Sequence, residues 1–169
     1  MSFTNSQKAK KLIAPIISGF VIATLLTGCG SGKTAATTQI KQVTDGVEGQ
    51  ADRIKIRNLL IVKQADGAGV LVGTLVNWAD EKDSITAISI EGQEAKITAK
   101  SLELNKNEPV IFVGDSANAD AYIAQLNDVI GHRIPVVIKF AKASPVTLDA
   151  LIVQADGVYA DIANMRFKG

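Results

Sequence analysis

The chain has 169 residues, of which 47% are apolar and 5% aromatic, with 18 Lys and Arg against 17 Asp and Glu. Three lysines and no acid lie in residues 1–28, so the remaining 141 residues carry 15 basic and 17 acidic side chains. This balance, without a basic cluster, argues against nucleic-acid binding, and a single cysteine excludes an internal disulfide.

The first 28 residues have the organisation of an export signal. Lys8, Lys10 and Lys11 precede an uncharged apolar run of about 16 residues, which is short for a membrane-spanning helix. The run ends in Leu-Thr-Gly before Cys29, and this ending resembles the lipobox of bacterial lipoproteins. The resemblance implies cleavage before Cys29 and acylation of its thiol, which would anchor the mature chain to the cell membrane on its extracytoplasmic face. An uncleaved N-terminal anchor is the alternative, and it places the rest of the chain on the same face.

Residues 29–52 are expected to form a flexible tether, because they are mostly small and polar and show no sustained apolar period. A tether of about 20 such residues has a root-mean-square reach of roughly 25 Å. The β-sandwich domain is expected to occupy residues 53–169, a length sufficient for one hydrophobic core.

Short runs rich in β-branched residues follow one another through this domain, separated by Asp-Gly, Glu-Gly and Gly-Asp turn signals. This pattern predicts an all-β domain, an antiparallel sandwich. The predicted strands are 53–57, 59–62, 69–77, 84–90, 94–98, 109–113, 134–141 and 146–153.

Residues 118–130 have a different pattern. Apolar residues at 119, 122, 123, 126, 129 and 130 are spaced by threes and fours, which predicts one short helix capped by Ser116 or Asn118 and ended by Gly131. A long loop is the competing interpretation.

Three short segments resemble parts of known functional sites but have simpler explanations. The Gly32-Lys33-Thr34 triplet lacks the upstream glycine of a phosphate-binding loop, because Thr27 occupies that position. His132, the only histidine, is expected to be a solvent-facing turn residue, since one histidine cannot build a multi-histidine zinc site. The acidic stretch from Asp80 to Asp83 is expected to be a solvated hairpin loop, with a weak hard-cation site as the alternative.

The mature chain offers few soft metal ligands, namely Met165, His132 and the acylated Cys29, so no metal site is predicted. No nucleophilic elbow, paired carboxylate motif or cofactor fingerprint is present, so the sequence predicts no catalytic residue, no cofactor and no enzymatic activity. Trp78, the only tryptophan, follows a predicted strand end, where it either packs at the core edge or serves as an interface anchor. Arg57 and Asn58 in the first predicted strand are similarly ambiguous.

Two segments of the domain resemble a known family. Residues 72–85, Val-Gly-Thr-Leu-Val-Asn-Trp-Ala-Asp-Glu-Lys-Asp-Ser-Ile, resemble the strand–Asn–loop–Asp–strand segment of the PCu(A)C periplasmic copper chaperones. Residues 131–140 resemble that family's Gly-Asp-x-Val-Pro-Val-x-Leu-x-Phe strand, and residues 146–153 its closing strand. The resemblance spans residues 53–155 and implies a cupredoxin-like or immunoglobulin-like Greek-key β-sandwich.

The chain departs from that family where copper would bind. The resemblance implies His and Met ligands near residues 97–102 and 121–126, and neither segment contains His or Met. No copper ligand is therefore carried over to this chain.

With the lipobox and the opening strand, the whole chain resembles actinobacterial lipoproteins of the LpqE type. This resemblance implies a non-catalytic accessory or interaction subunit, attached to the membrane through the acylated Cys29 and docked on the cytochrome bcc–aa3 respiratory supercomplex. The alternative is a copper chaperone-like protein that binds or delivers metal through unconventional ligands.

Overall fold

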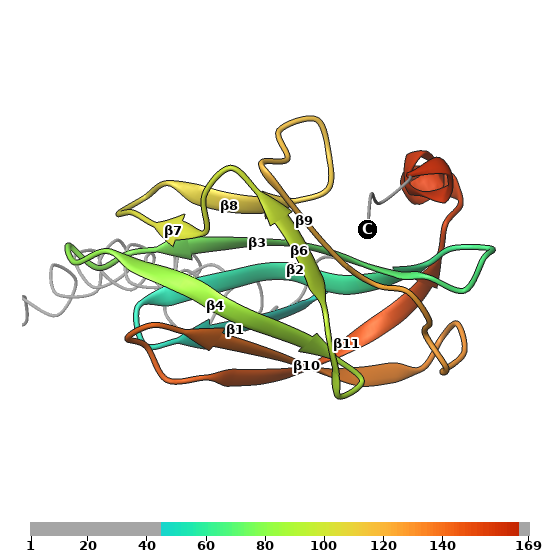
Figure 1. Cartoon of the computed structure of the whole chain (residues 1–169), viewed down its shortest axis with the longest axis horizontal. Coiled ribbons are helices and arrows are strands. Elements are labelled where there is room, and N and C mark those ends of the chain that lie inside the picture. Colours follow the sequence, from blue (N-terminus) through green and yellow to red (C-terminus); the bar gives the residue numbers. More distant parts are fainter. Residues whose placement is uncertain (1–44, 166–169) are drawn as a thin grey trace, which may run out of the picture. The chain divides into compact units, whose positions relative to one another are not determined.

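The computed structural model describes residues 45–165, and these residues form a β-rich domain (Figure 1). The strands in chain order are β1 (Val47–Ala51), β2 (Ile54–Lys63), β3 (Gly69–Asn77), β4 (Asp83–Ile90), β5 (Gln93–Glu94), β6 (Lys96–Ala99), β7 (Glu103–Leu104), β8 (Pro109–Phe112), β9 (Ala119–Ile123), β10 (Arg133–Phe140) and β11 (Val146–Gln154). One 3-10 helix, η1 (Gly157–Asn164), follows. The prediction of an all-β fold is confirmed.

The strands join in the order β5-β4-β10-β11-β2-β3-β8-β9-β6, and β1 and β7 pair with β2 and β4. Most neighbouring strands run antiparallel, as predicted, but β11 pairs with β2 in parallel and β8 touches β9 in parallel. The main hydrophobic core collects buried side chains from nine strands, so the strands close around one interior; these strands are β1, β2, β3, β4, β7, β8, β9, β10 and β11. Phe112 is the largest side chain fully buried in it.

Strands β2 and β3 are buried on both faces. Ile61 and Leu71 point into the main core, whereas Leu60 and Val72 belong to a second apolar cluster on the other face. Ile162 of η1 is buried in this second cluster, which explains why the sequence of β2 reads Leu-Leu-Ile-Val without polar alternation.

Asn58 interrupts β2 at a β-bulge. The pairing of β2 with β3 shifts register between Arg57 and Leu60, and Asn58 adopts a positive φ of 50°. Asparagine tolerates this left-handed conformation better than most residues, and its side-chain carbonyl accepts a hydrogen bond from the Gly46 amide at 3.2 Å.

Two expectations from the sequence need correction. The predicted helix at 118–130 does not form: β9 occupies Ala119–Ile123, and residues 124–132 are an irregular connection with turns. The short helix of the domain is instead η1 near the C-terminal end. The tether expected at 29–52 is wrong for residues 47–51, which form β1, while residues 29–44 lie outside the described part of the chain. Within residues 45–165, no helix is long and apolar enough to cross a membrane.

The connections gather at two ends of the domain (Figure 1). One end carries the β2–β3 turn, the β9–β10 connection and η1. The opposite end carries the β3–β4, β7–β8 and β10–β11 loops.

Candidate functional site: the loops around Trp78

The predicted lipid attachment residue, Cys29, lies outside the described residues, so its acylation stays a prediction. The Gly32-Lys33-Thr34 triplet also lies outside them, whereas Arg57, Asn58, Trp78 and His132 lie within the described domain. Of these, Trp78 has the geometry of a binding residue.

Trp78 is the first residue of the β3–β4 loop, and half of its surface is exposed. Its amide donates to the carbonyl of Arg53 at 3.0 Å, and the Arg53 guanidinium donates back to the Trp78 carbonyl at 3.4 Å. The ammonium of Lys55 lies 5.3 Å from the centre of the indole ring, within range of a cation–π contact. The backbone of Trp78 is therefore held by Arg53, the residue just before β2, while half of the Trp78 surface is exposed to solvent.

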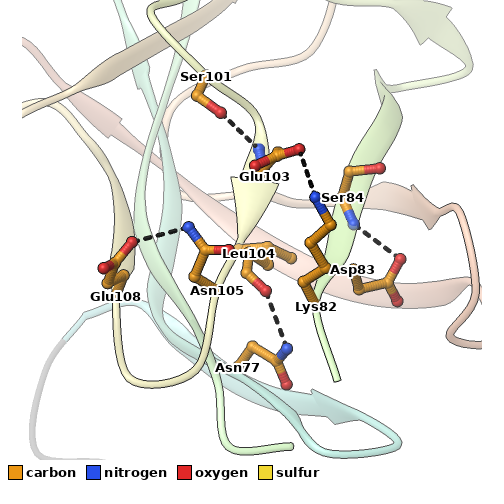
Figure 2. Close-up of polar contacts among 9 residues, drawn as sticks. All are labelled: Asn77, Lys82, Asp83, Ser84, Ser101, Glu103, Leu104, Asn105 and Glu108. Atoms are coloured by element: carbon orange, nitrogen blue, oxygen red, sulfur yellow. Dashed lines mark hydrogen bonds and ion pairs between the residues drawn. The ribbon is translucent and has the colours of Figure 1, made fainter. Parts of the chain in front are cut away.

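Asn77, the last residue of β3, organises the loop beneath Trp78. Its side chain is 1% exposed, and its amide group donates to the carbonyls of Glu81 at 2.7 Å and Leu104 at 2.9 Å. Its side-chain carbonyl accepts from the Ala79 amide at 2.8 Å. Figure 2 shows the bond to Leu104, which ties the loop to β7. One buried side chain thus satisfies three backbone groups of two separate segments.

Asp83, the first residue of β4, holds the β10–β11 loop beside the β3–β4 loop through hydrogen bonds. One of its carboxylate oxygens accepts the amides of Ser84 at 2.7 Å (Figure 2) and Lys142 at 2.9 Å, and the other accepts the Ala143 amide at 2.8 Å. Partial burial pushes the pKa of this carboxyl upward, but the backbone hydrogen bonds outweigh burial and hold the pKa below its usual value.

Charged side chains of both signs surround the loop. Three ion pairs, Lys82–Glu103 (Figure 2), Lys106–Asp80 and Lys142–Glu81, cross between neighbouring segments. The hydrogen bond and the charge of Lys106 lower the pKa of Asp80. All three pairs are well exposed, so they contribute little to stability and form a polar surface on the loops at this end of the domain.

The acidic stretch from Asp80 to Asp83, which was expected to be a solvated loop, is only partly exposed. Asp80 and Glu81 are exposed, but Asp83 is engaged with backbone amides and has little capacity left for a cation. A hollow of about 170 Å³ lies against this loop, lined in part by Asp52, Arg53 and Asp83. It is smaller than ordinary ligand pockets.

The remaining residues named from the sequence have local roles. His132 is exposed just before β10 and contacts the carboxylate of Asp128 at 2.7 Å, as expected for a turn residue. Arg57 forms an ion pair with Glu48 of β1, and Asn58 occupies the bulge in β2. The sequence did not reveal the anchoring role of Asn77, although an asparagine at the end of an apolar strand is a signal for side-chain bonds to the following turn.

The residues of the domain do not fit a soft-metal site. Segments 97–102 and 121–126 do come together, since Ile97 of β6 pairs with Ala121 of β9. Neither segment contains His, Cys or Met, and in the described range 45–165 no three side chains from His, Cys, Asp and Glu are grouped around a possible ion. These two segments therefore offer copper no set of soft ligands.

Comparison with known proteins finds no matching protein family and no matching curated protein. Among solved structures, the copper-bound PCuAC domain from PmoF2 aligns with a TM-score of 0.55 at 18% identity, over 64% of this chain and 98% of the other. The apo PCuAC domain from PmoF1 aligns with a TM-score of 0.55 at 20% identity, over 64% and 99%.

This chain has a PCuAC-like β fold. At these identities the similarity concerns the fold alone, and the fold agrees with the resemblance noted in residues 72–85 and 131–153.

Proposed function

We propose that this protein is a lipid-anchored, extracytoplasmic accessory subunit without catalytic activity, which docks on a membrane protein complex through the loops around Trp78. The observation that carries this proposal is the half-exposed indole on a backbone fixed by hydrogen bonds. A rigid exposed tryptophan loses little conformational entropy on binding, and tryptophan is enriched among the residues that dominate interface energies.

The charged side chains on the loops at the Trp78 end suit selective docking. Lysines and carboxylates are paired there, as Lys82–Glu103, Lys106–Asp80 and Lys142–Glu81, so a partner would need a complementary pattern rather than one sign of charge. Such pairs add more to specificity than to affinity.

Membrane attachment would make a weak contact sufficient. Acylation of Cys29 with two or more chains would hold the protein stably at the membrane, and the tether would raise the local concentration of the domain near its partner. The similarity to LpqE-type lipoproteins points to the cytochrome bcc–aa3 supercomplex as this partner.

The proposal is tested by affinity purification of the tagged full chain from native membranes in mild detergent. We expect respiratory complex subunits to be enriched with the unaltered chain and at least tenfold less enriched with Trp78→Ala. Val129→Ala is the matched control, because Val129 is 53% exposed but lies in the β9–β10 connection at the opposite end. The proposal fails if no membrane complex is enriched, or if Trp78→Ala and Val129→Ala behave alike.

A second function, copper binding, is motivated by the copper-bound PCuAC domain among the similar structures. His132 lies beside Asp128, whereas Met165 lies near η1, so the two soft donors of the domain have different surroundings. Titration of the full chain with Cu(I) decides between the functions. Tight one-to-one binding that His132→Ala or Met165→Ala abolishes would favour the copper function.

A further inference from the structure

Two basic side chains contact Trp78 without an ion pair of their own. The guanidinium of Arg53 donates to the Trp78 carbonyl at 3.4 Å, and the ammonium of Lys55 lies 5.3 Å from the centre of the indole ring. Within residues 45–165, neither cation forms an ion pair with a carboxylate. The ammonium of Lys55 donates instead to the uncharged side-chain carbonyl of Gln50. Two positive charges beside Trp78 thus have no direct acidic partner in the described part of the chain.

The lysines of the neighbouring loops already have acidic partners. They are paired as Lys82–Glu103, Lys106–Asp80 and Lys142–Glu81. The acids that come near Arg53 are engaged as well. The carboxylate of Asp52 accepts the Ser144 amide at 3.0 Å. The hydrogen bond and the charge of Lys106 lower the pKa of Asp80, and the charge of Arg53 adds a smaller decrease.

Arg53 and Lys55 are placed where a partner can reach them. They flank Ile54, which is buried, so both side chains point away from the core on the same side of the chain. Arg53 is exposed and Lys55 is partly buried. A guanidinium presents several N–H donors in a planar fork that matches a carboxylate, and such charge-assisted hydrogen bonds are about twice as strong as neutral ones.

We propose that the partner presents an acidic segment to Trp78, with two carboxylates next to an apolar side chain. The inference rests on the proposed docking function and names the chemistry of the partner at that site. One carboxylate binds the Arg53 guanidinium and the other binds the Lys55 ammonium, while the apolar side chain packs on the indole. Within the mixed charges of this end of the domain, the part of the partner that meets Trp78 is therefore negative.

The charges of the β3–β4 loop favour an acidic protein segment over an anionic membrane surface. A membrane of anionic lipids attracts surfaces with an excess of positive charge. The β3–β4 loop carries Asp80 and Glu81 against a single lysine, Lys82, and all three are exposed. A membrane plane would meet these acids together with the cations, whereas a short segment can contact Arg53 and Lys55 alone.

The test uses the intrinsic fluorescence of Trp78, which reports on this site alone because the chain has no other tryptophan. The full chain is titrated with an acetylated Asp-Glu-Leu-Asp-Glu peptide and with an uncharged Asn-Gln-Leu-Asn-Gln peptide. We expect a saturable change in emission, and at least tenfold tighter binding of the acidic peptide. Equal affinity for the two peptides would overturn the proposal.

Two double variants locate the charges that the peptide contacts. Combined Arg53→Gln and Lys55→Gln substitutions should weaken binding of the acidic peptide at least tenfold. Combined Arg133→Gln and Lys96→Gln substitutions remove two exposed cations at the beginning of β10 and β6, and should change it less than twofold. Equal effects of the two double variants would contradict the proposal.

A second measurement needs no substitution. Binding of the acidic peptide to the unaltered chain should weaken at least tenfold when the salt concentration rises from about 0.05 M to about 0.5 M, because salt screens exposed charges. Affinity that does not depend on salt would contradict the proposal. A blue shift of Trp78 emission with phosphatidylglycerol vesicles, without binding of the acidic peptide, would assign the surface to lipid headgroups and overturn it.

Purification from native membranes separates this proposal from the docking function. If Trp78→Ala lowers the enrichment and the Arg53 and Lys55 double variant does not, docking stands and the acidic partner segment is wrong. If no membrane complex is enriched, the docking function fails, whereas the peptide titration still decides which charge this surface binds.

Discussion

At the scale of single residues, Asn77 is the side chain on which the Trp78 end depends most. Its amide and carbonyl satisfy backbone groups of Ala79, Glu81 and Leu104, and it is almost completely buried. Truncation would leave buried backbone polar groups without partners, and each such group costs about 1–3 kcal/mol.

We therefore expect Asn77→Ala to lower the free energy of unfolding by about 3 kcal/mol in urea denaturation. Asn77→Asp is the informative comparison, because it keeps the acceptor for Ala79 and loses both donated bonds. A loss below about 0.5 kcal/mol in both variants would show that water replaces the side chain.

Asp83 makes the stability of the same end depend on pH. Its folded-state pKa lies below the unfolded value of about 3.9, so its carboxylate stabilises the fold above about pH 4. This contribution is lost as the pH falls through the folded-state pKa, because the protonated group accepts the amide hydrogen bonds less well.

We expect Asp83→Asn to lower the free energy of unfolding by about 2 kcal/mol at pH 7. The difference from the unaltered chain should shrink towards zero as the pH falls through the lowered folded-state pKa of Asp83, measured by urea denaturation across the pH range. A difference independent of pH would mean that shape rather than charge matters at this position. Asp66→Asn, at an exposed turn at the other end of the domain, is a suitable control.

At the scale of elements, β1 completes the edge of β2. Strand β11 pairs only with residues 60–63 of β2, and β1 covers the preceding part from Ile54 to Leu59. Without β1 the backbone groups on this side of Ile54–Leu59 would form an unpaired strand edge, which is costly and prone to aggregation.

A chain that begins at residue 45 should consequently be more stable than one that begins at residue 53. We expect a loss of about 3 kcal/mol or more from the removal of the five-residue strand β1, which includes buried Ala51, measured by thermal or urea unfolding. Equal stability of the two chains would place the domain boundary after β1.

Strand β9 forms where the spacing of apolar residues predicted a helix at 118–130. Residues 119–123 fit a helical spacing through Ala119, Tyr122 and Ile123, but Ala119, Ala121 and Ile123 also alternate with period two. Pairing with β6 decides between the two patterns, because it satisfies the backbone of β9 and turns Ala121 and Ile123 into the main core. Tyr122 then faces the second cluster.

At the scale of the whole molecule, the loops around Trp78 and the 3-10 helix η1 lie at opposite ends of the domain (Figure 1). Strand β3 runs nine residues from Gly69 to Asn77, roughly 27 Å, with Gln64 near its beginning and Trp78 at its end. Sites at this separation, with no shared partner, are expected to act independently.

The free energies of unfolding should therefore be additive for Asn77→Ala and Gln64→Ala, which remove anchors at the two ends. We expect the double variant to equal the sum of the single losses within about 0.5 kcal/mol in urea denaturation. A larger coupling energy would indicate that the strands transmit strain between the loops around Trp78 and η1.

The sequence by itself determined the fold class and the positions of most long strands, because each long β-branched run and the turn residues that bound it are contained in the segment itself. It also determined that residues 97–102 and 121–126, where the family resemblance implies copper ligands, contain no His or Met. Residue types can be read from the sequence without a structure. Only the tertiary structure decided that residues 47–51 form a strand, that β2 is buried on both faces, and that Asn77 and Asp83 anchor the Trp78 loops. These features depend on which distant segments meet: a polar side chain becomes an anchor only when folding brings backbone groups without partners within hydrogen-bond distance.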